Sequence, residues 1–310
     1  MKLTYATRRS ALALAQCRAF VARLKAAHPD LEMIEEQVVT TGDKIQDRPL
    51  SEVGGKGLFV KEIEEALLER RADLAVHSIK DVPGVLPDGL LIACIPTRED
   101  PRDVLVAPKH GGLESLPKAA KVGTSSLRRA VSLRAARPDL VIVPMRGNVD
   151  TRLRKVDEGE CDAIVLARAG LVRLGLEARA TEVLPPEISL PAVGQGALGI
   201  ECRIEDASTR ALLAVLHDEA SSRCVAAERG VMVALEGDCK TPLGAFGERR
   251  VLGDHTNELF LRAFICEPDG SNLRRGDVTV AWPASDDDAR VIGERLGAKL
   301  KAGSSGGRLL

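Results

Sequence analysis

Short apolar runs alternate with amphipathic segments through most of the chain, and this alternation predicts strands followed by helices. Helical spacing first appears at Leu14, Cys17 and Val21, directly after a strand-like run. Strands that alternate with helices indicate an α/β fold, with a mostly parallel sheet covered by helices on its faces. The predicted strands cover residues 2–6, 34–40, 73–76, 90–95, 103–107, 121–123, 140–144 and 163–167.

Helix start and stop signals place the helices between these strands. Ser10 is a suitable N-cap for a helix that ends near His28, because His28 is followed by Pro29. A second helix is expected from Leu58 to Arg71, after a polar loop over residues 42–57. Further helices are expected at residues 127–137 and 149–158, with a short one that ends at Arg173.

Two proline-containing linkers, residues 96–101 and 185–196, divide the chain into lobes. The strand-like segment 197–202 follows the second linker and is expected to return to the first lobe. We therefore predict two hinged, periplasmic-binding-protein-like α/β lobes and a small α+β C-terminal domain with two helices and three strands. The expected ranges are 1–96 with 197–216, 97–196, and 217–310.

Composition narrows the possible ligands. Of the 310 residues 45% are apolar, and the net charge is −1, so no general attraction to nucleic acid or a membrane is expected. Residues 121–155 nevertheless contain nine Lys or Arg and only two Asp, a local charge of +7. A local basic site on a nearly neutral protein indicates a small ligand with several negative charges.

The seven cysteines are scattered, without a C-x-x-C pair, so neither a zinc site nor a disulfide framework is predicted. This usage is typical of a reducing cytoplasm. We expect no targeting segment, no transmembrane helix and no metal.

The segment from His77 to Pro83 is the first candidate site. It follows a buried strand, and Pro83 cannot continue that strand because it lacks an N–H. Lys80 and Asp81 are therefore expected at the carboxyl end of a strand, where open α/β sheets bind ligands. The alternative is that Asp81 only forms a turn or caps a helix.

Arginines at predicted strand-to-helix junctions form the second candidate site. A helix N-terminus attracts anions, and an adjacent guanidinium adds a bidentate carboxylate contact. The alternative for any single one is a solvated helix face. The six arginines at such junctions are Arg8, Arg128, Arg129, Arg146, Arg152 and Arg173.

Cys239 stands in a loop rich in glycine, whereas the other six cysteines lie in apolar or helical runs. Lys240 would favour its thiolate and Asp238 would oppose it. The residue is either a nucleophile or merely exposed.

Four of these segments, in this order, resemble the porphobilinogen deaminase (hydroxymethylbilane synthase) family. They are His77–Pro83, Gly123–Arg129, Arg146–Leu153 and the Cys239 loop. The resemblance implies a transferase that joins four porphobilinogen molecules head to tail, releases ammonia and makes a linear tetrapyrrole. It also implies a dipyrromethane cofactor attached through a thioether to Cys239, and a monomer.

The resemblance assigns a role to each candidate residue. Asp81 is the catalytic carboxylate and also contacts the cofactor. The other expected cofactor contacts are Lys80, Thr124, Ser126, Arg128, Arg129 and Arg152, besides Cys239. The expected substrate contacts are Arg8, Ser10, Gln16, Phe59, Arg146, Arg152 and Arg173.

The chain departs from the family pattern at Asp238, where glycine is frequent, and at Glu52, where some members have lysine. Two other functions are compatible with hinged lobes and anion sites. A solute-binding or effector module is one, but it gives the loop thiol no role. A thiol-dependent transferase that acts on another polyanion is the second.

Overall fold

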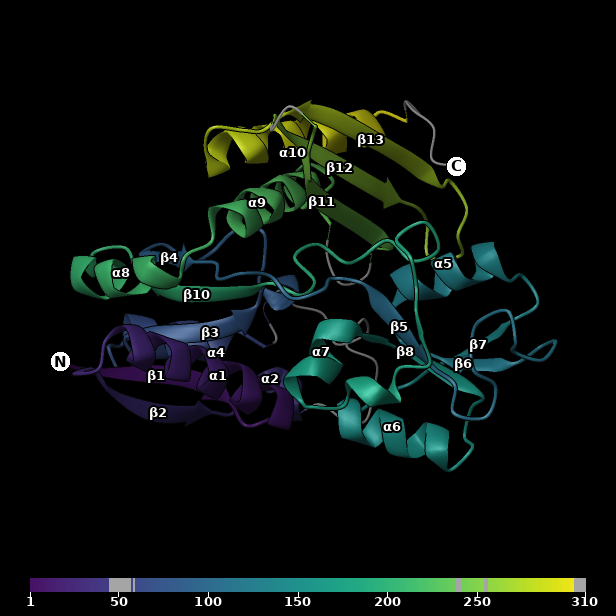
Figure 1. Ribbon diagram of the computed structural model, residues 1–310, viewed down its shortest axis with the longest axis horizontal. Coiled ribbons are helices and arrows are strands. Elements are labelled where there is room, and N and C mark those ends of the chain that lie inside the picture. The colour runs from purple at the N-terminus through teal and green to yellow at the C-terminus, as the bar shows by residue number, and fades with distance from the viewer. Residues whose placement is uncertain (45–56, 58, 238–240, 254–255, 304–310) are drawn as a thin grey trace. The chain divides into compact units, whose positions relative to one another are not determined.

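The computed structural model describes residues 1–44, 57, 59–237, 241–253 and 256–303. Contacts between Cα atoms divide the chain into two compact units (Figure 1). The first consists of Met1–Glu99 with Ala197–Ser222, and the second of Asp100–Gly196 with Arg223–Leu310. Each α/β lobe has its own five-stranded sheet, and a small C-terminal sheet with helices follows, so the predicted fold class is confirmed.

The first lobe is a five-stranded sheet with helices on both faces. Alternate residues of β3 divide between the faces: Leu74 and Val76 pack with α1, whereas Ala75 packs with α4. The strand order is β2 (Glu32–Val38), β1 (Lys2–Arg8), β3 (Leu74–Ser78), β10 (Leu198–Arg203), β4 (Leu90–Cys94). The helices are α1 (Ala11–Ala27), α2 (Thr41–Lys44), α4 (Lys61–Leu68) and α8 (Ala207–Leu213), with 3-10 turns η1 (Ile79–Asp81) and η3 (Ala214–Leu216).

The second lobe repeats this layout. Its sheet also has an apolar cluster on each face. The strand order is β7 (Val141–Val143), β6 (Lys121–Gly123), β8 (Ala163–Ala167), β5 (Asp103–Val106), β9 (Glu182–Val183). Its helices are α5 (Leu127–Ala136), α6 (Val149–Asp157) and α7 (Arg168–Arg173), with the turn η2 (Glu177–Arg179).

Both sheets are mixed, but in each one four of the five strands run in the same direction, so the expectation of a mostly parallel sheet is confirmed. In the first sheet β10 runs antiparallel to β3 and β4, and in the second β5 runs antiparallel to β8 and β9. Each of these two strands is reached by a linker without a helix. A parallel neighbour would need a crossover, which is usually helical.

The helix expected from Leu58 to Arg71 is shorter. It runs from Lys61 to Leu68, and Arg70 has a φ of 58°, a left-handed conformation that a helix cannot continue. The polar loop expected over residues 42–57 begins with part of α2, Thr41–Lys44, and its residues 45–56 lie outside the described part of the chain.

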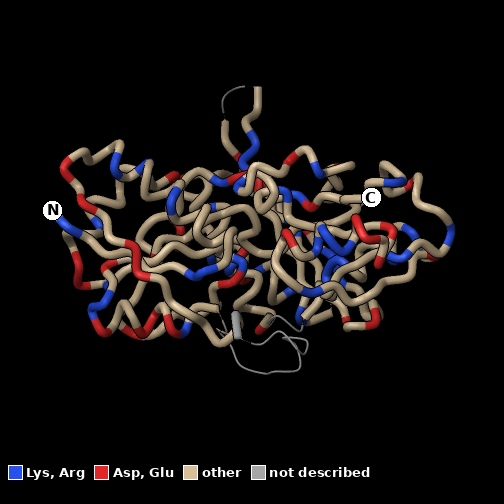
Figure 2. Tube along the Cα trace, turned by 90° about the horizontal axis from the view of Figure 1, so that it is seen from below, with Lys and Arg blue, Asp and Glu red and all other residues tan. Residues whose placement is uncertain are grey.

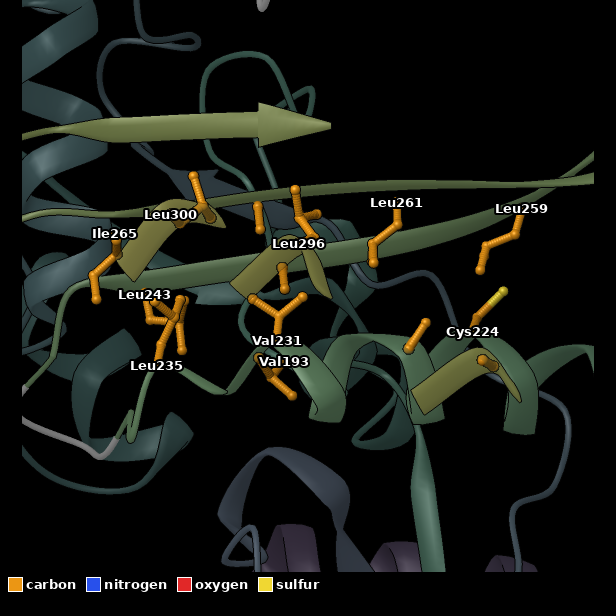
Figure 3. Close-up of a cluster of buried hydrophobic side chains, with 14 residues drawn as sticks. Val193, Cys224, Val231, Leu235, Leu243, Leu259, Leu261, Ile265, Leu296 and Leu300 are labelled. Atoms are coloured by element: carbon orange, nitrogen blue, oxygen red, sulfur yellow. The ribbon is translucent and has the colours of Figure 1, made fainter. Parts of the chain in front are cut away.

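The C-terminal domain places two helices against one face of an antiparallel sheet. Figure 3 shows its core, in which Val231 and Leu296 lie near Leu261. The helices cross closely, because a Cβ at Gly293 would lie 1.8 Å from the carbonyl oxygen of Ala227. The elements are α9 (Glu219–Ala234), β11 (Leu243–Val251), β12 (Asn257–Ile265), β13 (Arg274–Ala281) and α10 (Asp286–Lys301).

A further apolar cluster joins this domain to the second lobe. Val131 of α5 packs with Phe246 of β11 and Phe264 of β12, together with Leu190 and Cys266. Burial of the two phenylalanines and their aliphatic neighbours contributes on the order of 1.5–3 kcal/mol per side chain. This contact helps to explain why the second lobe and the C-terminal domain form one compact unit.

A single buried carboxylate, Asp103, organises the centre of the second lobe. It is fully buried, and its oxygens accept hydrogen bonds from Arg128 at 2.8 Å, and from Arg129 at 2.7 Å. Ser189 and Gln195 donate to it at 2.7 and 2.9 Å. Burial alone would raise the pKa of Asp103, but the two guanidinium groups hold it well below its usual range.

Replacing Asp103 with Asn should leave two buried guanidinium groups without a counter-charge. We expect the free energy of unfolding at pH 7 to fall by roughly 3–5 kcal/mol, the usual cost of breaking a buried ion pair. The lowered pKa means that this stabilisation is present above about pH 4 and is lost as the pH falls further. Urea unfolding at pH 7 and at pH 3 measures both effects.

The control is Asp157→Asn, because Asp157 forms a half-exposed pair with Arg179. Its loss should change the unfolding free energy by less than about 1 kcal/mol. Equal effects of the two substitutions would contradict the role given to Asp103.

Candidate functional site

A pocket lies in the first lobe, at the carboxyl ends of β1 and β3. These two strands run parallel, so their carboxyl ends lie at the same edge of the sheet. Residues from both faces of the sheet line the pocket. Its polar lining residues are Arg8, Ser10, Gln16, His77, Ser78 and Asp81.

The turn η1 holds Asp81 at this pocket through an apolar anchor. Ile79 is buried, and its amide donates to the carbonyl of Ala197 at 3.1 Å. Its side chain also fills the space above Gly199, where a Cβ would lie 2.3 Å from Ile79 Cδ1. Ile79 is therefore fixed in position. The next two residues, Lys80 and Asp81, are exposed, and Asp81 lines the pocket. The sequence-predicted pair therefore lies at the end of a strand.

Arg8 and Phe59 contact one another in the pocket wall. The guanidinium carbon of Arg8 lies 4.1 Å from the centre of the Phe59 ring, a cation–π geometry. The Phe59 ring also packs closely against Gly42, because a Cβ at Gly42 would lie 2.2 Å from the ring. Phe59 therefore supports Arg8, and its predicted stacking on a pyrrole stays a prediction.

Ser10 and Gln16 have local roles as well as lining the pocket. Ser10 caps α1 by accepting a hydrogen bond from the amide of Ala13. Gln16 is buried, and its side-chain oxygen accepts a hydrogen bond from the Ser78 hydroxyl at 2.9 Å. These bonds fix the wall of the pocket opposite α4.

The turn between β6 and α5 in the second lobe has the geometry of a helix start. Ser126 caps α5, with its hydroxyl oxygen accepting from the amide of Arg129. The hydroxyl oxygen of Thr124 accepts a hydrogen bond from the Ser126 amide at 3.1 Å. Both hydroxyl groups thus order the turn that carries Arg128 and Arg129.

The clustered guanidinium groups of the second lobe carry more positive charge than the carboxylate among them neutralises. Arg128, Arg129, Arg146 and Arg152 give four positive charges, and among these side chains Asp103 supplies one negative charge. Burial, then Arg129 and Arg146, lower the pKa of Arg152 to about 10. A group of cations that lower one another's affinity for protons is stabilised by an anionic ligand.

Arg146 has a buried nitrogen that can donate a further hydrogen bond. Its Nη1 atom is buried and has no hydrogen-bond partner among the described residues. A buried N–H that is not bonded is costly, so a partner is expected from a ligand or solvent. Arg152 donates to the carbonyl of Gly147 at 2.8 Å, and Arg173 to the carbonyl of Gly196 at 2.6 Å. This part of the lobe fits a ligand with several carboxylates.

The chain has one other comparable basic stretch, residues 1–29, which contain six Lys or Arg and no Asp or Glu. Figure 2 shows Lys and Arg interspersed with Asp and Glu along the trace, in keeping with the net charge of −1. The basic segment 121–155 is therefore a local feature rather than part of a general basic character.

Cys239 and its neighbours Asp238 and Lys240 lie outside the described residues, as does Glu52. The described chain reaches them from α9 and leaves them towards β11. The six other cysteines are buried. Burial raises the pKa of Cys17 and of Cys94 to about 12, so these thiols resist forming thiolates.

The described residues offer neither a metal site nor a membrane span. Within the described ranges, no group of three or more His, Cys, Asp or Glu side chains is arranged to hold a metal ion. No helix in this part of the chain is long and apolar enough to cross a membrane.

Sequence reasoning missed two features of the site. The buried role of Asp103 could have been inferred from the sequence, because a charged residue begins an otherwise apolar strand. The buried contact of His77 with Glu201, at 2.9 Å, joins residues 124 positions apart, and no local pattern indicates it.

Two family models and a curated relative match nearly the whole chain. The family model "Porphobilinogen deaminase, dipyromethane cofactor binding domain" matches residues 3–211, and "Porphobilinogen deaminase, C-terminal domain" matches residues 222–302. A curated relative from Sorangium cellulosum (strain So ce56), named "Porphobilinogen deaminase", is 62% identical over 302 residues, which are 97% of this chain and 99% of the relative.

Two solved structures show a more distant likeness. A YaeC-family lipoprotein from Enterococcus faecalis is 15% identical with a TM-score of 0.41, over 69% of this chain and 90% of its own. The periplasmic aliphatic sulphonate binding protein of Escherichia coli is 14% identical with a TM-score of 0.40, over 76% of this chain and 70% of its own. The family models and the 62% identical relative decide the assignment: the chain belongs to the porphobilinogen deaminase family.

Proposed function

We propose that this protein is a hydroxymethylbilane synthase, a transferase of tetrapyrrole biosynthesis. It condenses four porphobilinogen molecules head to tail, releases ammonia, and produces the linear tetrapyrrole hydroxymethylbilane. The observation that carries the proposal is the 62% identity to a porphobilinogen deaminase over 97% of the chain. The pocket beside Asp81 and the unneutralised arginines of the second lobe support it.

The proposed cofactor is a dipyrromethane attached through a thioether to Cys239. When bound, it supplies a nucleophilic pyrrole carbon on which the chain of rings grows. The residues that would hold it are Lys80, Asp81, Thr124, Ser126, Arg128, Arg129 and Arg152. Because each ring has an acetate and a propionate, the guanidinium groups would pair with carboxylates in charge-assisted hydrogen bonds.

The proposed role of Asp81 follows from its exposed carboxylate at the pocket. Loss of ammonia from porphobilinogen leaves a pyrrole cation, which a nearby carboxylate stabilises electrostatically. After the new carbon–carbon bond forms, the same carboxylate accepts the proton that leaves the pyrrole carbon. The turn η1 holds the group in place, so little reorganisation is needed at either step.

The proposed substrate contacts divide by chemistry. Arginines would bind the acetate and propionate groups of incoming rings, and the buried unbonded N–H of Arg146 is suited to this task. Ser10 and Gln16 would add hydrogen bonds, and Phe59 would contribute an aromatic face. The full set is Arg8, Ser10, Gln16, Phe59, Arg146, Arg152 and Arg173.

We further propose that the protein is a cytoplasmic monomer whose partner is its small substrate. Its domains would cover residues 1–96 with 197–216, 97–196 and 217–310. Nucleic acid and membranes have no part in this function.

Cys239→Ser should abolish the covalent cofactor, because serine is a poor nucleophile towards the electrophilic methylene carbon. Intact-protein mass and Ehrlich's aldehyde reagent measure the bound dipyrromethane. Cys161→Ala is the control, since Cys161 is buried in the second lobe and should leave the adduct in place. An adduct that persists on the Cys239 variant would rule out this attachment.

Asp81→Asn keeps the size of the side chain but removes its charge. In protein that has been loaded with cofactor, we expect product formation to slow by roughly 10²–10⁴-fold, the usual contribution of a general acid or base. Single-turnover assays measure the rate, and Asp88→Asn, an exposed turn residue, is the control. A loaded Asp81 variant with the normal rate would refute the catalytic role.

Arg146→Leu should stop elongation part way, because a later ring would lose its carboxylate partner. Quenched reactions analysed by mass should then accumulate an intermediate adduct instead of free product. Arg134→Leu, on the exposed side of α5, should elongate normally. The same distribution of adducts in both variants would contradict the assignment.

A further inference from the structure

Three titratable side chains meet inside the first lobe, on the face of the sheet that α4 covers. His77 comes from β3, Glu201 from β10 and Glu64 from α4. His77 Nε2 lies 2.9 Å from an oxygen of Glu201. The exposed fractions are 5% for His77, 1% for Glu201 and 7% for Glu64, so water scarcely reaches the group.

Two carboxylate oxygens in this group have no hydrogen-bond partner among the described residues. Oε1 of Glu64 and Oε1 of Glu201 are buried and meet no hydrogen-bond donor among the described residues. Buried carboxylates are normally paired, and two that lie close together cannot both be ionised at low cost. Burial, and then the charge of Glu201, raise the pKa of Glu64 to about 7. Glu64 is therefore about half protonated at neutral pH.

The charged groups around the cluster do not neutralise it. On α4, Glu65 adds a further negative charge near Glu64. On β10, Arg203 is bonded to Asp73 at 3.0 Å and to Asp206 at 3.2 Å. Arg8 and Asp81 are the further charged residues that line the pocket with His77.

His77 lines the same pocket as Asp81 while its ring contacts Glu201. His77 thus connects the lining of the pocket to the buried carboxylate of Glu201, which interacts electrostatically with Glu64. We propose that His77 relays protons between the pocket and a proton store formed by Glu64 and Glu201. This inference rests on the proposed function, because the coupling step releases the proton that the store receives.

The relay conserves the number of protons, and each transfer breaks one N–H or O–H bond and forms another. The proton lost from the pyrrole carbon passes from Asp81, through solvent in the pocket that both residues line, to Nδ1 of His77, and the proton on Nε2 passes to Glu201. Each electron pair stays on the atom that loses its proton. The reverse transfers return the proton to the pocket, where released ammonia takes it up as ammonium. His77 therefore acts through Asp81 and is a positioning and relay residue.

The test compares His77→Gln with His110→Gln in protein carrying its cofactor. His110 also faces a carboxylate, Asp162 at 3.8 Å, but lies in the second lobe and outside the pocket. For His77→Gln we expect an intact adduct, a nearly unchanged KM, and a kcat lower by about 10- to 100-fold, which is at or below the lower end of the effect usual for a general acid or base because His77 acts through Asp81. The kcat–pH profile should lose one ionisation, whereas His110→Gln should match the wild type.

A kcat–pH profile of His77→Gln that runs parallel to the wild type would overturn the relay. Infrared spectroscopy of the wild type at pH 6 gives a second measurement that does not depend on activity or on the folding of that variant. A protonated carboxyl band should be present and should disappear in Glu64→Gln. Absence of the band in the wild type would refute the proton store, whereas absence of adduct and product in the wild type would refute the proposed function instead.

Discussion

The buried pairing of Asp103 with Arg128 and Arg129 is the constraint on which the second lobe depends. A guanidinium group stays charged under ordinary conditions, so each one taken out of water must meet an anion or a carbonyl. One carboxylate fixes two of these groups at the start of α5 and also bonds to Ser189 and Gln195 in the linker. The helix start that carries the predicted anion site is thereby held rigidly.

The same constraint leaves positive charge available for a ligand. Asp103 is only one charge, and Arg146 and Arg152 lie beyond its pairing. A lobe with more carboxylates would be more stable alone but would have less to gain from an anionic ligand. The unneutralised arginines thus lower the stability of the free lobe and increase its affinity for a ligand whose carboxylates neutralise them.

The first lobe solves a different problem, which is to hold one carboxylate at the rim of an apolar sheet. Burial of Ile79 beneath the turn sets the direction of Asp81, and Arg8 is supported by the ring of Phe59. Apolar packing therefore positions the polar groups. Behind them, His77, Glu201 and Glu64 form a buried titratable group whose protonation is coupled to the pocket through one ring.

Much of this organisation was predictable from local patterns in the sequence. The strand that ends before Asp81, the caps at Ser10 and Ser126, and the return of residues 198–203 to the first sheet all follow from short stretches of residues. The antiparallel course of β5 and β10 was not predictable in this way, because strand direction is decided by partners far along the chain. The same holds for the Asp103 and His77 contacts, whose partners lie 25 to 124 residues away.

The central claim is that carboxylates of a bound dipyrromethane neutralise the arginines of the second lobe. Calorimetry of cofactor-free protein with an unreactive dipyrromethane tetra-acid, and with its tetramethyl ester, tests this claim directly. The acid should bind about 100-fold more tightly than the ester, since two lost charge-assisted hydrogen bonds are worth roughly 3 kcal/mol, and its affinity should fall as salt is added. Equal affinities of acid and ester, or binding that is insensitive to salt, would contradict the account.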